Sequence, residues 1–505
     1  MKTQVAVLDY GSQYSQLIVR RIRELGFFAR LYPPSEIRSL GPVAAVILSG
    51  GPRSVVEPNA PDVDLEYLKS LQAPVLGICY GMQMLNVRFG GRVTAGAVRE
   101  YGPAQIHVDE NNTLFNGLGR TLRVWMSHSD TVTEWPADGR ILARNSTEHP
   151  VAIRWNERFY GIQFHPEVSH TEEGTKILRN FLSLCRLSPD YSIASYKNEL
   201  LRTIPEVVKG REVVCAVSGG VDSTVLAVLL RESGVRMRPI LVDTGLLRKN
   251  EAGEVVRNFE ALGLRVEKID AGARFLAALD GVADPEQKRE IIGDLFVREF
   301  HAAAGHIELL AQGTLYPDVI ESGTSGSEIA SRIKTHHNRV GKILELKREG
   351  KIIEPLSDLF KDEVRELGKV LGVPPDILGR HPFPGPGLAV RIPGCVTGEK
   401  LDILREADVI LIRILKQWGW YSKIWQALCV LLPVRTVGIK GDERSYEYAL
   451  SVRCVISQDA MTADWADLPH GILREISNAI LNGVKGVNRV LYDVSTKPPA
   501  SIEWE

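Results

Sequence analysis

The sequence predicts an α/β protein with two parallel-sheet α/β domains followed by a smaller α+β domain. Strand-sized apolar runs alternate with helix-like segments from the start, as in QVAVLD at 4–9 and the helix expected over about 14–25. A second alternation begins with VVCAV at 213–217 and continues with PILVDT at 239–244. Such βαβ alternation is typical of parallel sheets, whose active sites gather at the carboxyl ends of the strands.

The third domain has a different order of elements. A helix is expected over about 399–417, followed by two alternating strands, a helix near 470–482 and a strand at 488–494. The segment at 380–394, RHPFPGPGLAVRIPG, is rich in proline and glycine, which excludes a regular helix and indicates a hinge or connection. At 505 residues the chain is too long for one core. We expect three domains, at 1–190, 191–381 and 382–505.

The composition excludes several classes of protein. Basic and acidic residues number 61 and 62, for a net charge of −1, so the chain lacks the basic surface of a nucleic-acid binder. Apolar runs are strand-sized, which argues against a membrane protein. The first residues lack the apolar region of a signal peptide, which favours the cytoplasm. None of the six cysteines has CxxC spacing, so neither a disulfide framework nor a zinc site is expected.

Cys79 has the sequence context of a catalytic nucleophile. Gly77-Ile-Cys79-Tyr80-Gly81 lies between a predicted strand and a predicted helix, with the G-x-nucleophile-x-G spacing of a nucleophile elbow. The glycines allow a sharp turn that lifts the sulfur toward substrate. The backbone N–H of Tyr80 would then face a developing oxyanion, and Gly51 of the SGGP loop (49–52) would supply a second donor.

His165 and Glu167 provide a base and its orienting carboxylate. In YGIQFHPEV (160–168) they are two residues apart, so on a strand they would face the same side. The imidazole would deprotonate the thiol, and the carboxylate would fix the ring tautomer and stabilise the imidazolium. A buried structural thiol and a loop histidine are the alternative for either residue taken alone. The elbow, the SGGP loop and the H-x-E pair together favour catalysis.

The strings GICYGMQ, SGGP and FHPEV resemble the class I, triad-type glutamine amidotransferases, over residues 3–190. The resemblance implies that glutamine is hydrolysed through a glutamyl thioester on Cys79, with release of ammonia. The chain departs from the family pattern at MSHSD (126–130), where Ser129 replaces a common glycine. This departure concerns the shape of the glutamine pocket and leaves the chemistry unchanged.

A second candidate site, suited to binding phosphate, follows VVCAV. The string SGGVDST at 218–224 precedes an apolar-periodic helix, so its backbone amides and helix N-terminus suit a phosphate. It lacks the spacing and lysine of a Walker A motif. A structural turn is the alternative for a Ser-Gly-rich string alone. The whole string resembles the PP-loop of the N-type ATP pyrophosphatases, which transfer AMP from ATP to an oxygen and release pyrophosphate.

The PP-loop resemblance implies ATP as co-substrate, with Mg²⁺ to offset the phosphate charge. No metal ligands can be assigned from the sequence. Val242 could line the adenine pocket and Lys361 could meet phosphate, or they could be a core valine and a solvated lysine. The residues that the resemblance assigns to ATP are Ser218, Gly219, Gly220, Val221, Asp222, Ser223, Thr224, Val242 and Lys361.

Longer motifs resemble the GMP synthetase family over essentially the whole chain. They include DPEQKREIIGD (284–294), IKTHHN (333–338), RHPFPGPGLAVR (380–391) and KPPASIEWE (497–505). The resemblance implies amination of xanthosine monophosphate (XMP), a mobile lid at 284–294 and a C-terminal dimerisation domain, hence a homodimer. It assigns XMP contacts to Arg289, Gln426, Arg489, Lys497 and Glu503.

Two other functions would explain part of this sequence. A sulfur-inserting ligase that modifies tRNA would also carry a PP-loop, but the near-neutral charge and the lack of paired catalytic cysteines speak against it. A regulatory binding module with inactive sites would not retain Cys79, His165, Glu167 and SGGVDST together. The sequence therefore predicts an enzyme that uses glutamine, ATP and XMP, with no nucleic-acid or membrane partner.

Overall fold

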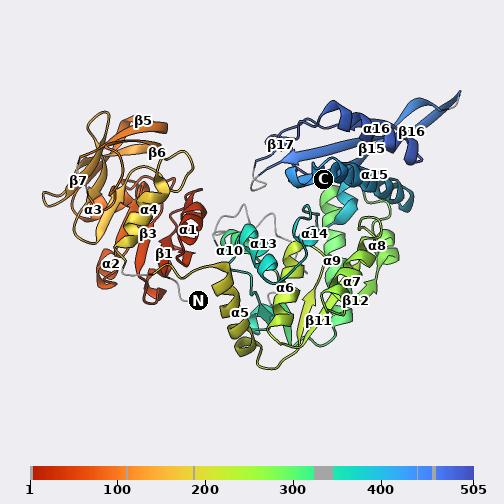
Figure 1. The fold of residues 1–505 in the computed structure, drawn as a ribbon, viewed down its shortest axis with the longest axis horizontal. Coiled ribbons are helices and arrows are strands. Elements are labelled where there is room, and N and C mark those ends of the chain that lie inside the picture. The colour runs from red at the N-terminus through yellow and green to blue at the C-terminus, as the bar shows by residue number, and fades with distance from the viewer. Residues whose placement is uncertain (1–3, 110–111, 186–187, 324–344, 441, 458–461) are drawn as a thin grey trace. The chain divides into compact units, whose positions relative to one another are not determined.

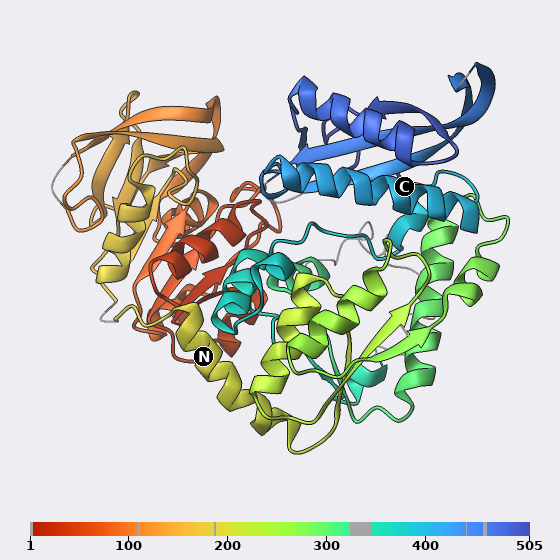
Figure 2. The same ribbon diagram turned by 45° about the vertical axis from the view of Figure 1, so that its right-hand side comes forward.

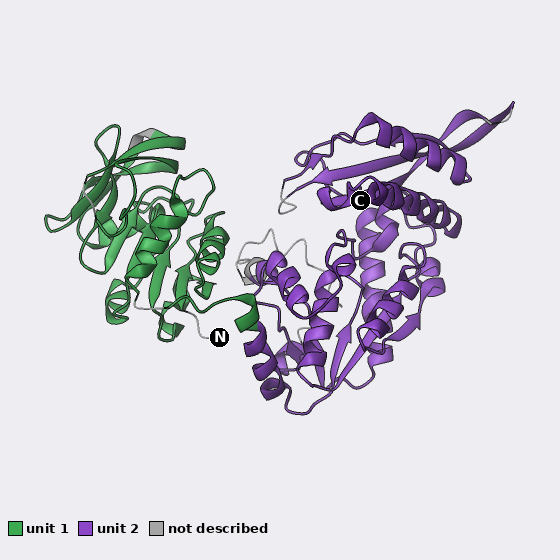
Figure 3. Ribbon diagram, viewed as in Figure 1, with its two compact units in different colours: residues 1–196 green, residues 197–505 purple. Residues whose placement is uncertain are grey.

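The computed structural model describes residues 4–109, 112–185, 188–323, 345–440, 442–457 and 462–505. The chain forms two compact units, Met1–Tyr196 and Lys197–Glu505 (Figure 3). Helix α5 (Ile193–Val208) begins in the first unit and continues in the second. The division of the second unit near residue 381 stays a prediction. IKTHHN lies outside the described residues.

The first unit is built on a nine-stranded sheet with the order β2-β1-β3-β4-β9-β8-β7-β5-β6. The strands are β1 (Val5–Leu8), β2 (Ala29–Tyr32), β3 (Ala45–Leu48), β4 (Val75–Ile78), β5 (Arg92–Val108), β6 (Thr121–Glu134), β7 (Arg140–Asn145), β8 (Pro150–Arg154) and β9 (Phe159–Ile162). The helices are α1 (Ser15–Glu24), η1 (Pro34–Ser39), α2 (Leu65–Ser70), α3 (Tyr80–Arg88) and α4 (Gly174–Ser183).

The sheet of the first unit is mixed, which corrects the expectation of a parallel sheet. β2, β1, β3, β4 and β9 pair in parallel, whereas β8, β7, β5 and β6 extend the sheet by antiparallel pairing. Parallel neighbours need long crossovers, and here helices supply most of them. Residues 92–154 instead form strands joined without intervening helices, so these strands pair antiparallel. β1, β3, β4 and β9 are buried along their whole length.

The first sheet of the second unit is parallel, as predicted. Its order is β12-β11-β10-β13-β14. The strands are β10 (Val213–Ala216), β11 (Met237–Asp243), β12 (Glu267–Asp270), β13 (Leu309–Ala311) and β14 (Ile352–Ile353). The helices are α6 (Val221–Glu232), α7 (Glu251–Ala261), α8 (Gly272–Ala278), α9 (Pro285–Ala304), α10 (Tyr316–Gly323), α13 (Lys361–Val370) and α14 (Pro375–Leu378).

The last part of the chain confirms the expected α+β arrangement. α15 (Gly398–Gln417) and α16 (His470–Gly483) contribute to one apolar core with the sheet. Its strands are β15 (Gln426–Lys440), β16 (Glu443–Ile456), β17 (Asp464–Trp465) and β18 (Val487–Tyr492). β15 and β17 pair antiparallel with β16, and β18 pairs parallel to it. The β15–β16 hairpin runs on past the helices that cover its base (Figures 1 and 2).

The proline-rich segment at 380–394 is a buried connection that contains a short 3-10 helix, η2 (Gly387–Arg391). His381 anchors its start, with the ring stacked on Tyr421 at a centroid distance of 3.8 Å. Nε2–H donates to the Tyr421 carbonyl over 2.8 Å, and Nδ1 accepts from the Ala427 N–H over 3.2 Å. The imidazole is therefore neutral, consistent with burial lowering the pKa of His381 to about 4.

Three fully buried cations hold the segment at 495–505. Arg391 pairs with Glu503, at 2.9 Å and 3.1 Å, and Lys288 pairs with Glu505 at 2.5 Å. Arg453 donates to the carbonyls of Ser495, Ser501 and Ile502. Because a buried charge is costly without a partner, these pairings fix the segment against the domain. The segment is therefore docked against the domain.

The segment at 284–294 forms the first half of α9, whose N-cap Asp284 accepts from the Gln287 N–H. Lys288 within it is completely buried and donates to the carbonyls of Ala389 and Ile392 as well as to Glu505. These contacts bind the segment to η2 and the end of the chain. Here the segment is a packed helix, and its role as a lid stays a prediction.

We predict that Glu505→Gln lowers the free energy of unfolding by about 3–5 kcal/mol, since it leaves Lys288 buried beside a neutral partner. Denaturant unfolding of the full chain measures this loss. The control is Glu406→Gln, which removes the half-exposed partner of Lys249 and should change the stability by less than about 1 kcal/mol. Equal effects of the two substitutions would contradict the structural role of the Lys288–Glu505 pair.

Candidate active site

Cys79 occupies a strained turn between β4 and α3. Its backbone has φ 53° and ψ −107°, a left-handed φ that is rare for a residue with a side chain. The two flanking glycines are sterically required. A Cβ on Gly77 would lie 2.5 Å from the carbonyl oxygen of Gly81, and one on Gly81 would lie 2.5 Å from the carbonyl oxygen of Leu48. The nucleophile elbow expected from the sequence is therefore present.

His165 and Glu167 form a buried pair. The Nδ1–H of His165 donates to Oε1 of Glu167 over 2.7 Å, and the two residues are 2% and 0% exposed. The expectation that they lie on a strand was wrong, because β9 ends at Ile162 and the pair follows in a turn that contains Pro166. The turn, rather than the alternation of a strand, brings the carboxylate to the ring.

The other contacts of His165 fix the ring beside the nucleophile. The ring is close enough to Cys79 to interact electrostatically with its thiol, and Tyr14 packs edge-on against the ring at a centroid distance of 5.0 Å. A Cβ on Gly50 would lie 3.1 Å from Cε1 of His165 and 3.6 Å from Cβ of Cys79, so glycine leaves room for the pair. Burial opposes protonation, but the charge of Glu167 and the interaction with Cys79 raise the pKa of His165 well above its ordinary value.

The two expected oxyanion donors border the same turn. Tyr80 is the first residue of α3, and the N–H groups of a first helical turn have no partner within the helix. Gly51 follows β3, and a Cβ there would lie 2.7 Å from the carbonyl oxygen of Tyr10. The thiol of Cys79 faces the carbonyl oxygen of Ser127 at 3.6 Å. Ser129 has no positive φ, so the replacement of glycine there causes no backbone strain.

The PP-loop connects β10 to α6. Gly219 has φ +73°, and a Cβ there would lie 2.2 Å from Cγ2 of Val255, so the loop requires glycine. The hydroxyls of Ser218 and Ser223 lie 3.2 Å apart at the exposed mouth of the loop. Thr224 instead turns inward, donating to the carbonyl of Gly220 over 2.8 Å. Val221 is also buried, so the two residues support the loop from below.

Charged side chains converge on Asp222 of the loop. Its Oδ1 is buried without a hydrogen-bond partner. Burial raises the pKa of the Asp222 carboxyl, while the charges of Lys361 and Arg365 lower it and that of Asp318 raises it. Lys361, the first residue of α13, is thus close enough for its charge to act on Asp222, and its contact with phosphate stays a prediction.

Two further residues border the PP-loop. Val242, near the end of β11, is buried on the strand next to β10. Arg380 was not predicted from the sequence as a residue of this site. Its Nη1 donates to the carbonyl of Gly219 over 2.9 Å, and its guanidinium lies 3.8 Å from the carboxylate of Glu251 and 3.6 Å from that of Glu254. The RHPFPGPG motif contained it, but sequence spacing gave no sign that it reaches the loop.

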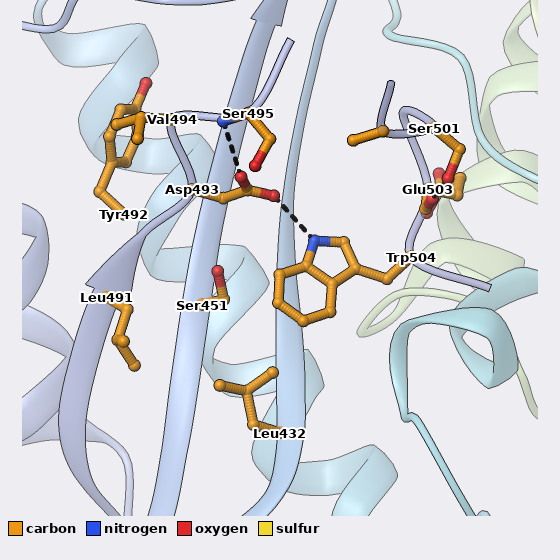
Figure 4. Close-up of a pocket in the computed structure, with 11 residues that line it drawn as sticks. Leu432, Ser451, Leu491, Tyr492, Asp493, Val494, Ser495, Ser501, Glu503 and Trp504 are labelled. Atoms are coloured by element: carbon orange, nitrogen blue, oxygen red, sulfur yellow. Dashed lines mark hydrogen bonds between the residues drawn. The ribbon is translucent and has the colours of Figure 1, made fainter. Parts of the chain in front are cut away.

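Two of the residues assigned to XMP meet in one cluster. Gln426 is buried and donates from Nε2 to Oε1 of Glu503 over 2.6 Å, the oxygen that also accepts from Arg391. A cavity of about 530 Å³ borders Glu503 on the sheet. Figure 4 shows Trp504 forming one wall of this cavity, with its indole N–H donating to Asp493 over 3.0 Å.

The other three residues assigned to XMP have different contacts. Lys497 forms a β-bridge with Ala463, and Arg289 lies 3.7 Å from Glu286 on α9. Arg489 pairs with Ala449, whereas Gln426 pairs with Val455 six residues further along β16. Six residues of a strand span about 20 Å, so within one chain Arg489 is far from Gln426.

Two family models match the chain. The model described as glutamine amidotransferase class-I covers residues 6–185, and that described as GMP synthase C terminal domain covers residues 413–504. The glutamine-hydrolysing GMP synthase of Thermosipho melanesiensis is 51% identical over 519 aligned positions, covering 100% of both chains. That of Nitratidesulfovibrio vulgaris strain Miyazaki F is 50% identical over 517 positions, covering 100% of this chain and 99% of its own.

The chain belongs to the glutamine-hydrolysing GMP synthase family. As a GMP synthase of this type, it is an enzyme that couples a glutamine amidotransferase to the amination of XMP. A solved glutamine amidotransferase from Thermotoga maritima is 20% identical, with a TM-score of 0.28, over 46% of this chain and 96% of its own. Among the described residues of this GMP synthase, no helix is long and apolar enough to cross a membrane.

We predict that Glu167→Gln lowers the pKa of His165, since it removes the charge that stabilises the imidazolium. NMR titration of the His165 Cε1–H measures the shift. The raised pKa stabilises the fold below about pH 6.5, and this contribution is lost as the pH rises through the folded pKa. Glu157→Gln, at a surface pair with Arg154, is the control and should leave the titration unchanged. An unshifted His165 in Glu167→Gln would refute the assignment.

Proposed function

We propose that Cys79, His165 and Glu167 carry the glutaminase reaction. The sulfur of Cys79 attacks the side-chain amide carbon of glutamine, and His165 takes the thiol proton and then gives it to the leaving nitrogen. Ammonia departs, leaving a glutamyl thioester that water hydrolyses to glutamate. The N–H groups of Tyr80 and Gly51 would stabilise the oxyanion, each by about 3 kcal/mol. The 2.7 Å contact between His165 and Glu167 beside a strained nucleophile carries this proposal.

In the second unit we propose that the PP-loop binds ATP. A purine carbonyl oxygen of XMP attacks the α-phosphorus of ATP, so that pyrophosphate leaves and adenylyl-XMP forms. Ammonia then attacks the activated carbon and displaces AMP, giving GMP. The amides of 218–221 and the N-terminus of α6 would hold the pyrophosphate, and Lys361 would neutralise part of its charge. Val242 would contact adenine.

Mg²⁺ would offset the phosphate charge and orient the leaving pyrophosphate. Asp222 is the residue that fits this ion, because its Oδ1 is buried without a partner beside the loop. The described residues hold no cluster of three or more acidic, histidine or cysteine side chains that could form an all-protein site. One carboxylate completed by phosphate oxygens and water is the coordination that Mg²⁺ favours with nucleotides.

For XMP we propose contacts to Arg289, Gln426, Lys497 and Glu503, and to Arg489 from a second copy of the chain, because Arg489 lies about 20 Å from Gln426 within one chain. The cations suit a nucleotide phosphate, and the hydrogen-bonded Gln426–Glu503 pair suits the polar edge of a purine.

We also propose a homodimer, which sedimentation velocity of the full chain tests. Its support is a set of exposed apolar side chains on the β15–β16 hairpin, namely Val434, Val437, Ile439 and Tyr446.

We predict that Cys79→Ala abolishes GMP formation from glutamine and leaves GMP formation from high ammonium intact, because only the first unit loses its nucleophile. Steady-state assays with XMP, ATP and either nitrogen source measure both rates. Asp222→Asn is the counterpart and should lower both rates by about 10²-fold or more. If Cys79→Ala removed both activities while its thermal unfolding matched the parent, the division of labour between the two sites would be wrong.

A further inference from the structure

A buried polar group that the glutaminase mechanism does not use lies on β6. Alternate residues of this strand face the core, and most of them are apolar. Two polar residues, His128 and Asp130, interrupt the row, and both are 6% exposed. Because a buried polar side chain is costly unless its partners are supplied, their surroundings indicate what they do. The apolar members of the row are Leu122, Val124, Met126 and Val132.

Both ring nitrogens of His128 face acceptors. Nδ1 lies 2.9 Å from the backbone oxygen of Asp130, and Nε2 lies 3.0 Å from Oε2 of Glu100, the residue opposite on β5. The contact of Nε2 with Glu100 is short but is not a well-aligned hydrogen bond. The ring therefore lies between the backbone of β6 and the carboxylate of Glu100 on β5. Asn145 donates to the other Glu100 oxygen over 3.0 Å.

Residues 127–130 of β6 contact three parts of the glutaminase site. The Ser127 carbonyl faces the thiol of Cys79 at 3.6 Å. The Asp130 carbonyl accepts from Nε2 of Gln83 over 2.9 Å, and Gln83 lies one helical turn after Cys79 on α3. The Asp130 carboxylate accepts from the hydroxyl of Ser54, on the loop that follows Gly51. A shift of this stretch would therefore move the nucleophile, the oxyanion loop and the thiol contact together.

We propose that Glu100 is a positioning residue for glutamine hydrolysis. Through its contact with the His128 ring it holds residues 127–130 of β6 against α3 and the SGGP loop, and so sets the geometry in which glutamine meets Cys79. The inference rests on the proposed role of Cys79 in the glutaminase reaction. A misplacement of about 1 Å at such a site lowers rates by roughly 10²-fold, so a residue without contact to substrate can matter strongly.

The same two strands provide a matched control. Arg92 on β5 and Glu134 on β6 are register partners with an ion pair at 3.3 Å, but their side chains are 66% and 60% exposed. Glu134→Gln is thus the same change of charge on the same pair of strands, without the buried histidine. If Glu100 merely stabilised the sheet, Glu100→Gln and Glu134→Gln would differ in their free energy of unfolding but not in their kinetic constants for glutamine.

The test compares Glu100→Gln, Glu100→Asp and Glu134→Gln in the full chain. Glu100→Gln should raise the KM for glutamine and lower the glutamine-dependent kcat/KM by about 10- to 100-fold, with GMP synthesis from ammonium unchanged. Glu100→Asp should restore part of the loss, because it retains the charge. Glu134→Gln should match the parent in every assay. Alkylation of Cys79 by iodoacetamide should still go to completion, since the thiol remains.

Three results would overturn the inference. The first is a KM and kcat/KM for glutamine in Glu100→Gln that equal those of the parent. The second is a fall in its ammonium-dependent rate in parallel with its glutamine-dependent rate. The third is a change in the kinetic constants for glutamine in Glu134→Gln as large as that in Glu100→Gln. If Glu100→Gln does not fold, His128→Gln removes the ring that Glu100 contacts and should raise the KM for glutamine in the same way. Persistent glutamine-dependent synthesis in Cys79→Ala would instead refute the proposed glutaminase role, whatever Glu100→Gln shows.

Discussion

The strained backbone at Cys79 is the constraint on which the first unit depends. A φ of 53° at a residue with a side chain persists only when the surroundings enforce it. Gly77 and Gly81 leave no room for a Cβ, since the chain on either side of the turn is in backbone contact with its neighbours. The parallel core of the sheet then fixes the neighbouring loops. The SGGP loop follows β3 and the turn with His165 follows β9, and these two strands lie on either side of β4.

The second unit is organised by charge rather than strain. Lys288, Arg391 and Arg453 are buried cations from a helix, a connecting segment and a strand, and each contacts the last residues of the chain. A buried ion pair need not stabilise a fold more than apolar residues would, but it specifies which segments must meet. These ion pairs and hydrogen bonds hold Glu503 next to Gln426 at the edge of the sheet. Arg380 links the PP-loop to the same connecting segment.

Local signals in the sequence were sufficient for the elements that carry chemistry. The elbow and the PP-loop each need small residues between a strand and a helix, and this requirement is legible in GICYGMQ and SGGVDST without any tertiary information. The helices at 15–24 and 398–417 and the β15–β16 hairpin followed from periodicity in the same way. The mixed character of the first sheet did not, because pairing direction depends on connections that link distant strands.

The sequence by itself determined the α/β class and indicated the candidate nucleophile, its histidine and carboxylate, and the candidate phosphate loop, since these depend on residues close together in the chain or on a distinctive string. Only the tertiary structure decided that His165 and Glu167 meet in a turn, that Arg489 stands far from Gln426 within one chain, and that Glu100 pairs with His128 behind the thiol. Each of these depends on how strands and turns pack in space, and neither spacing nor composition records that packing.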